Sequence, residues 1–483
     1  MAVVIIFGFA LARRPTGGPG RCERLITHPS SYRSVNVIIA GAGEVGYYTA
    51  RSLYSEGWEV AIVDSDHAAA DRAEALDALV VRGNAASTQK LEEAGIKDAQ
   101  TFIAVTAVDE VNIVACSVAK GYGVNTIARI NSPDYIDRPV STDRLKLLGI
   151  DVAICPDLVA AHKIVRILME PPALLESDVF AKGRIKVIQV TPGEHAPVLR
   201  TAIRDIAWPR GANLAAIFRK GEVIVPHGAD AILPGDRIVV VGDDESIHDI
   251  QKMLDIAHRK GGEEEPIQKV MIGGATRIGV NVAKLLERDV SVVLFEPDQE
   301  LAEAASAQLG GVLVIQGEPT DRDLLIEEGI TSADAFIGAT PVEGKNILSC
   351  LLAKRLGASS TIALIDQVEL VDLLHNVGID LATSPRIATV NTLLQYTHRS
   401  EDLLSLAVMQ QGEARVLEMV VTPGSKVAGR TLKRAGLPAN TIISAIVRGE
   451  QIVIPHGDTE LEVGDTMVIF ARTEAIPKLK KII

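Results

Sequence analysis

The chain contains the same module twice, and this duplication restricts the fold more than any other feature. The segment VIIAGAGEVG of residues 37–46 recurs as VMIGGATRIG in residues 270–279. Later in each copy LEEAGIKDAQTFIAVT recurs as LIEEGITSADAFIGAT, and IVPHG recurs as IVIPHG. Matches that stay in order over so long a period indicate a duplicated multidomain module rather than a solenoid of short repeats. Any fold assigned to one copy must therefore suit the other.

The composition is that of a large, acidic α/β protein. With 483 residues the chain can form several domains, because single cores stop growing at roughly 250 to 300 residues. A hydrophobic content of 47% with only 4% aromatic residues suits layers of valine, isoleucine and alanine. The net charge of −13 argues against a nucleic-acid partner and against docking on an anionic bilayer. After residue 34, no apolar stretch reaches the roughly 20 residues of a spanning helix, so we expect no direct bilayer insertion.

Residues 1–34 have no counterpart in the second copy. Their apolar run, residues 2–12, is shorter than a spanning helix. Arg13 and Arg14 follow that run, whereas basic residues precede the apolar run of a signal peptide. We therefore expect residues 1–34 to be an extension outside the fold, with translation beginning near Val35.

From Val35 onward, short apolar runs alternate with helical stretches. This alternation predicts right-handed βαβ crossovers and a doubly wound, Rossmann-like parallel sheet. After a predicted helix at its end, Pro171 and Pro172 interrupt the pattern, and shorter strands predict a small α+β domain. The expected order is a Rossmann-like domain at 35–170, a small domain at 171–259, a linker at 260–266, a second Rossmann-like domain at 267–400 and a second small domain at 401–483.

The cysteines and the paired Gly-Asp segments do not predict a metal site. The four cysteines show neither a CxxC motif nor metal-ligand spacing. Cys116 and Cys350 occupy matching positions on the apolar side of a predicted helix, so we expect both to be small buried side chains. Gly235-Asp236 and Gly464-Asp465 lack neighbouring carboxylates at ligand spacing, which predicts turn residues.

A glycine fingerprint in the first copy predicts a nucleotide site. A GxGxxG motif follows a predicted strand and opens a predicted helix, the context that makes this motif informative. The first glycine permits a tight turn, the second lets the backbone approach a pyrophosphate, and the third lets the helix pack on the sheet. The N–H groups at the helix start, where the dipole is positive, can then hold the anion. We expect this loop to bind the phosphates through Gly41, Gly43, Glu44, Val45 and Gly46.

Polar residues at the ends of other predicted strands complete the candidate site. Asp64 follows the motif by about 20 residues, where a carboxylate accepts hydrogen bonds from ribose hydroxyls. Its charge disfavours the 2′-phosphate of NADP, but NAD(H), ATP and ADP all offer free ribose hydroxyls and remain open. Asn84, Thr106 and Arg129 also follow strands, and ligands of open α/β sheets bind at these ends. Arg129 is the candidate phosphate contact, because a guanidinium has a fork of donors.

The second copy departs from the first at three of these positions. Thr276 stands in place of Gly43, and its branched side chain should obstruct a pyrophosphate. Glu296 replaces Asp64, and Leu364 replaces Arg129. We therefore expect the second site to be empty, weak or altered in ligand choice.

With these motifs and this order of domains, the chain resembles the TrkA regulatory subunits of Trk potassium-uptake systems. Those proteins alternate two Rossmann-like RCK N-terminal domains with two RCK C-terminal domains. The resemblance spans residues 35–483 and depends on GAGEVG with Asp64, on AVTAVDEVN, and on the repeated IVPHG and PGD/VGD segments. The alternating order of the domains is more specific than any one of these motifs.

The resemblance implies a cytosolic protein without catalysis of its own, peripheral to the cytoplasmic face of the membrane. RCK modules of the family pair through a crossover helix. They assemble as homo-oligomers, a dimer or a tetrameric ring, beneath a potassium-translocating membrane subunit, TrkH. Both NAD(H) and adenine nucleotides are ligands in the family. Thr276 puts ligand binding by the second copy in doubt.

Two other classes of function remain open from the sequence. An NAD-dependent oxidoreductase would need an acid or base beside the nicotinamide, and the first small domain offers His195, His227 and His248. His227 recurs as His456 next to the degraded fingerprint, which favours a structural turn over catalysis. The other alternative is a soluble nucleotide sensor unlinked to transport, because nothing in the sequence specifies a membrane partner.

Overall fold

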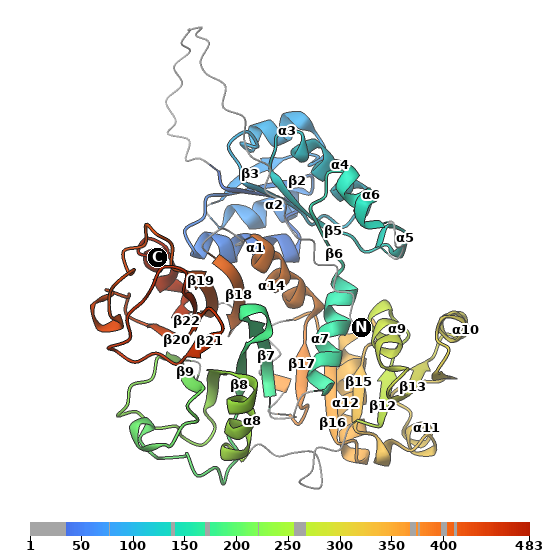
Figure 1. The fold of residues 1–483 in the computed structure, drawn as a ribbon. Helices are drawn as coiled ribbons and strands as arrows, with labels where there is room; N and C mark the ends of the chain where they lie inside the picture. The colour runs from blue at the N-terminus through green and yellow to red at the C-terminus, as the bar shows by residue number, and fades with distance from the viewer. Residues whose placement is uncertain are drawn as a thin grey trace. The chain divides into compact units, whose positions relative to one another are not determined.

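Parallel Rossmann-like sheets alternate with small antiparallel sheets along the chain, which confirms the predicted fold class (Figure 1). The expected extension at 1–34 and linker at 260–266 lie outside the residues that this computed structural model describes. The described residues are 35–76, 78–136, 141–169, 174–220, 222–255, 267–367, 373–374, 377–397, 403–409 and 413–483.

The first Rossmann-like domain is built on a parallel sheet with strand order β3-β2-β1-β4-β5-β6. Chain order reverses between β1 and β4, and such a switch point is where open α/β sheets bind their ligands. The strands are β1 (Val37–Ala40), β2 (Val60–Asp64), β3 (Leu79–Arg82), β4 (Thr101–Ala104), β5 (Asn125–Arg129) and β6 (Val152–Ile154). The helices are α1 (Glu44–Ser55), α2 (His67–Glu74), α3 (Thr88–Glu93), α4 (Asp109–Lys120), α5 (Pro133–Ile136) and α6 (Ser141–Leu147).

The second Rossmann-like domain repeats this topology as β14-β13-β12-β15-β16-β17. Its central strands β15 and β16 are buried along their whole length, as expected for a parallel sheet covered by helices. The strands are β12 (Lys269–Gly273), β13 (Ser291–Glu296), β14 (Val312–Gln316), β15 (Ala335–Gly338), β16 (Ser360–Leu364) and β17 (Leu381–Thr383). The helices include α9 (Arg277–Leu286), α10 (Gln299–Gln308), α11 (Arg322–Glu327) and α12 (Glu343–Leu356).

Helix α7 (Pro156–Met169), which follows β6 directly, packs against the second copy. The chain divides after Ile154 into two compact units, and α7 belongs to the second. Its buried residues Ala161, Ile164 and Leu168 recur at helical spacing and join the core that contains Val282 of α9. Helix α14 (Pro385–Thr397), the equivalent of α7 in the second copy, also packs against α7. The helix predicted at the end of the first copy therefore buries its apolar stripe on the second.

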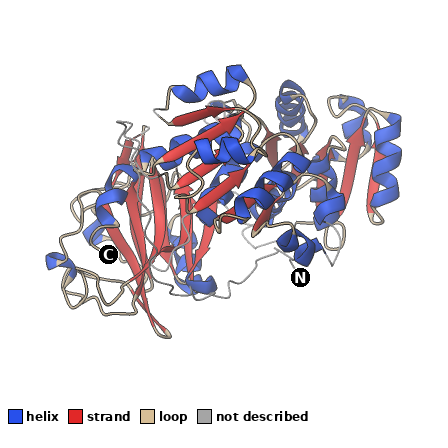
Figure 2. Ribbon diagram, turned by 90° about the horizontal axis from the view of Figure 1, so that it is seen from above, coloured by secondary structure: helices blue, strands red, loops and turns tan. Residues whose placement is uncertain are grey.

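The small domains are antiparallel sheets with equivalent orders, β7-β8-β11-β9-β10 and β18-β19-β22-β20-β21. Figure 2 shows the strands of the protein in red and its helices in blue. One face of each sheet contributes to a common core, in which Val187 and Val416 are fully buried. The rings of Phe218 and Phe470 lie 6.4 Å apart between the sheets. The elements are β7 (Leu174–Phe180), β8 (Ile185–Val190), β9 (Ala212–Arg219), β10 (Glu222–Ile224), β11 (Arg237–Gly242) and α8 (Asp244–Met253), then β18 (Leu403–Met409), β19 (Ala414–Val420), β20 (Thr441–Arg448), β21 (Gln451–Val453), β22 (Thr466–Arg472) and α15 (Ile476–Leu479).

A buried aspartate closes the same turn in both small domains. In the first, Arg219 donates from Nε and Nη2 to the two oxygens of Asp236 at 2.8 and 2.7 Å. The Leu233 N–H donates to the same carboxylate at 2.7 Å. Arg448 and Asp465 repeat this arrangement in the second domain. The sequence predicted these aspartates as turn residues, and the arginine that neutralises each one comes from the neighbouring strand.

We predict that Arg219→Ala destabilises the protein by about 3 kcal/mol, because it leaves a buried carboxylate without its charge partner. The Asp236 side chain is only 2% exposed. Urea unfolding of the full chain measures the loss. Arg204→Ala is the control, since the pair of Arg204 with Asp205 at 3.8 Å is exposed and should contribute little. Equal effects of the two substitutions would contradict the prediction.

Candidate functional site

The glycine loop, residues 41–46, turns sharply against the end of β4. Gly41 has φ +111°, a conformation that side chains disfavour, and a Cβ there would lie 3.0 Å from the Thr106 nitrogen. A Cβ at Gly46 would lie 1.9 Å from the Gly41 carbonyl oxygen. By contrast, a Cβ at Gly43 would meet nothing within 4 Å. The first and third glycines are therefore required by the turn, whereas the second borders open space.

Helix α1 begins at the open side of this loop without a side-chain cap. Gly43 is the N-cap residue and provides no side chain for the first N–H groups. Glu44 is exposed in the first turn, while the Val45 side chain is buried. Val45 can therefore meet a ligand through its backbone alone. An uncapped helix N-terminus next to open space is suited to an anion.

The Asp64 carboxylate at the end of β2 holds the glycine loop in place. One carboxylate oxygen accepts a hydrogen bond from the Ala42 N–H, and the other accepts from the Asp66 N–H at 2.8 Å. Asp66 itself caps α2, because its side chain accepts from the Ala69 N–H at 2.9 Å. Asp64 is only partly buried, so its remaining lone pairs can accept from a ribose. The predicted ribose contact thus also fixes the loop that would hold the phosphates.

Buried Asn112 of α4 joins the ends of β4 and β5. Its Oδ1 accepts from the Thr106 N–H at 2.9 Å and from the Thr106 hydroxyl at 2.7 Å. Its Nδ2 donates to the carbonyl oxygens of Thr106 and Arg129 at 3.1 and 2.9 Å. Sequence reasoning did not identify Asn112 as part of the site. Its recurrence as Asn346, which makes the same four bonds in the second copy, was the available signal.

The predicted site residues do not all share one set of contacts. The glycine loop, Asp64 and Thr106 are joined by the contacts just described, and Asn112 adds Arg129. The Arg129 side chain donates from Nε to Asn131 at 3.4 Å. Asn84 follows β3 at the edge of the sheet, and its side chain accepts from the Ala86 N–H at 2.9 Å in a local turn. Among the described residues, no contact links Asn84 to the others.

Arg72 of α2 also reaches the glycine loop, which the sequence did not predict. Its Nη2 donates to the Ala42 carbonyl oxygen at 3.2 Å. Its guanidinium carbon lies 5.0 Å from the centre of the Tyr47 ring, a cation–π distance. A positive charge is therefore held beside the loop that we expect to bind phosphates.

In the second copy a threonine occupies the position of the central glycine. Thr276 caps α9 by accepting from the Gly279 N–H at 3.2 Å, and its hydroxyl donates to the Ala339 carbonyl oxygen at 2.7 Å. Its backbone, φ −64° and ψ 165°, matches that of Gly43, φ −58° and ψ 179°. The threonine therefore fits the same fold while its side chain occupies the space that the first copy leaves open.

The rest of the second site shows one retained contact and one lost charge. Glu296 accepts from the Ala275 N–H at 2.7 Å, as Asp64 does from the loop of the first copy. Leu364 is buried at the position of Arg129. Beyond it, Arg386 donates to Asp366 at 3.0 Å, and burial together with the charge of Glu343 raises the pKa of Asp366. Arg386, the cation at this edge of the second sheet, is thus paired with a carboxylate of the protein itself.

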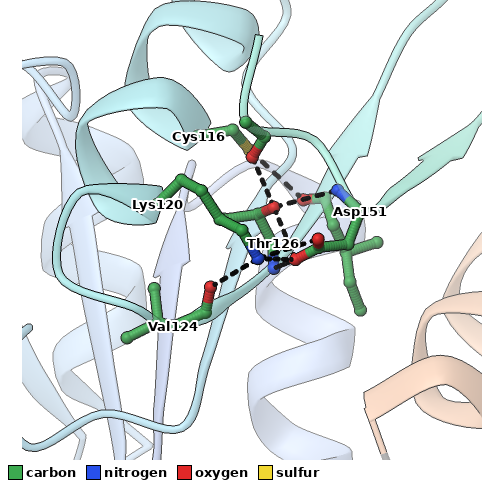
Figure 3. Close-up of polar contacts among 7 residues, drawn as sticks. Cys116, Lys120, Val124, Thr126 and Asp151 are labelled. Atoms are coloured by element: carbon green, nitrogen blue, oxygen red, sulfur yellow. Dashed lines mark hydrogen bonds and ion pairs between the residues drawn. The ribbon is translucent and has the colours of Figure 1, made fainter. Parts of the chain in front are cut away.

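A structural polar cluster lies at the amino-terminal ends of the strands in each parallel sheet, opposite the ends that border the glycine loop. Figure 3 shows Lys120 at the end of α4 bound to Asp151 at 2.6 and 2.8 Å, while Asp151 also accepts from the Thr126 N–H at 2.8 Å. Lys354, Asp380 and Thr361 repeat these contacts in the second copy. Next to each cluster lies a buried cysteine, as predicted for Cys116 and Cys350. Burial raises the pKa of both thiols, that of Cys350 to about 12, which disfavours the reactive thiolate form.

Of the histidines considered for an oxidoreductase, His248 lies on helix α8, whereas His227 and its counterpart His456 lie beside exposed turns. The His227 N–H donates to Asp230 at 2.7 Å, and the His456 N–H donates to Thr459 at 2.9 Å. These equivalent backbone contacts identify turn residues in both copies. Within the described ranges, no cluster of three or more His, Cys, Asp or Glu side chains could bind a metal ion. No helix there combines the length and apolarity needed to cross a bilayer.

Comparison with known proteins assigns every domain to a family model. The TrkA-N domain matches residues 37–156 and 270–385, and the TrkA-C domain matches residues 187–255 and 416–483. A Trk system potassium uptake protein TrkA homolog of Archaeoglobus fulgidus is 38% identical over 453 residues, covering 93% of this chain and 100% of the relative. Trk system potassium uptake protein TrkA of Vibrio alginolyticus is 35% identical, covering 90% of this chain and 95% of the relative.

Solved structures show the same fold at lower sequence identity. The RCK domain of GsuK aligns with a TM-score of 0.57 and 19% identity, covering 95% of this chain and 98% of that one. The GsuK channel bound to NAD aligns with a TM-score of 0.57 and 19% identity, covering 94% of this chain and 79% of that one. The chain therefore shares the fold of the GsuK RCK domain over almost its whole length.

We predict that Asn112→Ala and Asn346→Ala each destabilise the protein by about 3 kcal/mol, because each leaves buried backbone groups without partners. The losses should be similar, since the two asparagines make equivalent bonds. Chemical denaturation of the full chain measures both. Asn84→Ala, which alters only an exposed local turn, is the control. The prediction is wrong if Asn112→Ala is no more destabilising than this control.

Proposed function

The chain belongs to the TrkA family of Trk potassium-uptake proteins, and we propose that it is a nucleotide-responsive regulatory subunit that gates a TrkH-like potassium-translocating membrane subunit. The family models match both copies, and the curated relatives align over most of their length. The resemblance inferred from GAGEVG and the alternating domains is thereby confirmed. The nucleotide ligand, the membrane partner and the gating role are what we propose beyond membership of the family.

The observation that supports a nucleotide site most strongly is the contrast between Gly43 and Thr276. Both residues have the same backbone conformation at the start of a helix. In the second copy the threonine hydroxyl caps the helix and fills the space in front of it. In the first copy that space is open and the helix has no side-chain cap. The first copy alone leaves room for a phosphate to occupy this position.

The ligand that we propose is NAD(H) or an adenine nucleotide, ATP or ADP. All of these have a phosphate chain for the glycine loop and ribose hydroxyls for Asp64. The solved channel with this fold and NAD bound supports the dinucleotide. We propose Arg129, whose backbone carbonyl is bound by Asn112, as a phosphate contact from the β5 side. Asn84, at the far edge, is proposed as an adenine-side contact only.

Ligand binding can affect the loop after β5 through α4. Asp109, the first residue of α4, accepts from the Asn131 and Ser132 N–H groups at 2.9 and 2.7 Å. Asn112, one turn later, binds Thr106 and Arg129. A ligand that contacts both the glycine loop and Arg129 would therefore favour one position of α4 and of that loop. It shifts the gate only by its difference in affinity for the two states.

The required difference is modest for an oligomer. Moving a gate from 1:99 to 99:1 takes about 5.5 kcal/mol of differential binding, which several subunits can share. We propose a homo-oligomer, a dimer or a tetrameric ring, at the cytoplasmic face of the membrane and held there by the partner subunit. In this role the protein binds and transmits and has no catalytic step, which agrees with the exposed turn positions of His227 and His456.

We predict that Gly43→Thr weakens binding of NADH and ADP by more than about 10-fold, because the added side chain takes the place of a phosphate. The fold should tolerate the change, since Thr276 adopts the same conformation. Its new cap should change the stability of α1 by only a few tenths of a kcal/mol. Isothermal titration and thermal unfolding measure the two effects.

The control for this variant is Arg82→Ala, which removes a side chain paired with Asp71 and Glu74 on the surface of the same domain. It should leave affinity near wild type. Wild-type affinity in a folded Gly43→Thr protein would exclude the glycine loop as the phosphate site.

Growth at limiting potassium tests the transport role. A bacterial host that lacks its own TrkA and expresses a matching membrane subunit should regain growth when the chain is supplied. Gly43→Thr should alter the response without reducing the amount of protein. If the wild-type chain neither restores growth nor co-purifies with the membrane subunit, the alternatives of a free nucleotide sensor and an NADH-dependent oxidoreductase are favoured. Oxidation of NADH with small oxo acids then separates those two.

A further inference from the structure

Arg72 is held beside the glycine loop by two independent contacts. Its Nη2 donates to the Ala42 carbonyl oxygen at 3.2 Å. Its guanidinium lies 5.0 Å from the ring centre of Tyr47, which belongs to α1. Helix α2, on which Arg72 lies, is itself fixed because Asp66 caps its first turn. The position of the charge therefore depends on α1, α2 and the loop together.

Both backbone polar groups of Ala42 are hydrogen-bonded to side chains at the candidate site. Its N–H donates to Asp64, and its carbonyl oxygen accepts from Arg72. A guanidinium has five N–H donors, of which the Ala42 carbonyl uses one. Arg72 is exposed, so the other N–H donors of its guanidinium are accessible to a ligand. Gly43, the residue of the loop that borders open space, directly follows Ala42 in the chain.

A neighbouring arginine shows what a purely structural role looks like. Arg82, at the end of β3, donates to Asp71 and Glu74 of α2 at 2.5 and 2.8 Å. Its charge is neutralised by these exposed carboxylates. For Arg72, no ion pair occurs among the described residues. Arg72 belongs to α2 and Arg82 contacts it, but only Arg82 is paired with carboxylates among the described residues.

The second copy lacks both members of the Arg72–Tyr47 pair. Counting from the capping aspartates Asp66 and Asp298, the equivalent of Arg72 is Ala304. Counting from Gly43 and Thr276, the equivalent of Tyr47 is Val280. The copy that fills its phosphate position with a threonine hydroxyl thus also lacks this cation. The chain keeps the pair where the loop is open.

We propose that Arg72 positions the nucleotide of the first copy by donating hydrogen bonds to a phosphate oxygen at the glycine loop. This inference rests on the proposed nucleotide site and adds a cation from α2 to it. The ligand chemistry is the phosphate of an adenosine phosphate, which NAD(H), ATP and ADP share. Asp64 and Arg72 then have separate tasks: the carboxylate binds the ribose and the guanidinium binds the phosphate.

Titration of full-length Arg72→Ala with ADP and with adenosine tests this assignment. Affinity for ADP should fall about 10-fold, the effect of losing a hydrogen bond to a charged group. Affinity for adenosine, which has no phosphate, should stay within about twofold of wild type. The salt dependence of ADP binding should also decrease, because one cation no longer meets the phosphate. Arg72→Lys should recover part of the ADP affinity, since the charge is kept.

Arg82→Ala is the matched control, because it removes an arginine that contacts the same helix but is paired with carboxylates. It should leave both affinities near wild type. Equal losses for ADP and adenosine in Arg72→Ala would mean that Arg72 only supports the loop, and would overturn the assignment. An unchanged ADP affinity in Arg72→Ala would overturn it as well, while the proposed site would stand. Failure of the wild-type protein to bind any of these nucleotides would overturn both.

Discussion

The close approach of α1 to the carbonyl of Gly41 is the constraint on which the first Rossmann-like domain depends. A side chain at residue 46 would overlap the Gly41 oxygen, and Gly274 and Gly279 show the same restriction in the second copy. The loop can turn from β1 into α1 only with glycine at these two positions. The central position is free of this restriction in both copies. The first and third glycines of the motif are thus required by the fold, whereas the second is available for the ligand that we propose.

This separation explains why the fold could be predicted from the sequence more completely than the site. Alternating strands and helices, and the motif at the first turn, are local patterns that predict the parallel sheet and place Gly43 and Asp64 at its carboxyl edge. The contacts of Arg72 and Asn112 are different, because their partners come from other elements. The residue types alone, an arginine and an asparagine within predicted helices, do not indicate which residues they contact. Asn84 illustrates the reverse case, since its place after a strand was correct but its side chain is used in a local turn.

The duplication also makes the two copies depend on each other. Helix α7 continues from β6 and buries Ala161, Ile164 and Leu168 in the second copy. The small domains share a core across their sheets, with Phe218 next to Phe470. Apolar surface buried in this way is removed from water only while the copies stay together. The last strand of the first sheet, β6, is therefore covalently continuous with a helix that packs on the second copy.

The asymmetry between the copies suits a regulatory protein. In the second copy the Thr276 hydroxyl caps α9, and Arg386 is paired with Asp366, so the polar groups at this edge are bound by the protein itself. The first copy leaves the α1 N-terminus without a side-chain cap. A phosphate that supplied the missing cap would stabilise the first copy in its bound form and leave the second unchanged. We expect the second copy, whose helix is capped by its own threonine, to keep one conformation. The first copy, whose helix would be capped only by a bound phosphate, can respond to the concentration of a nucleotide.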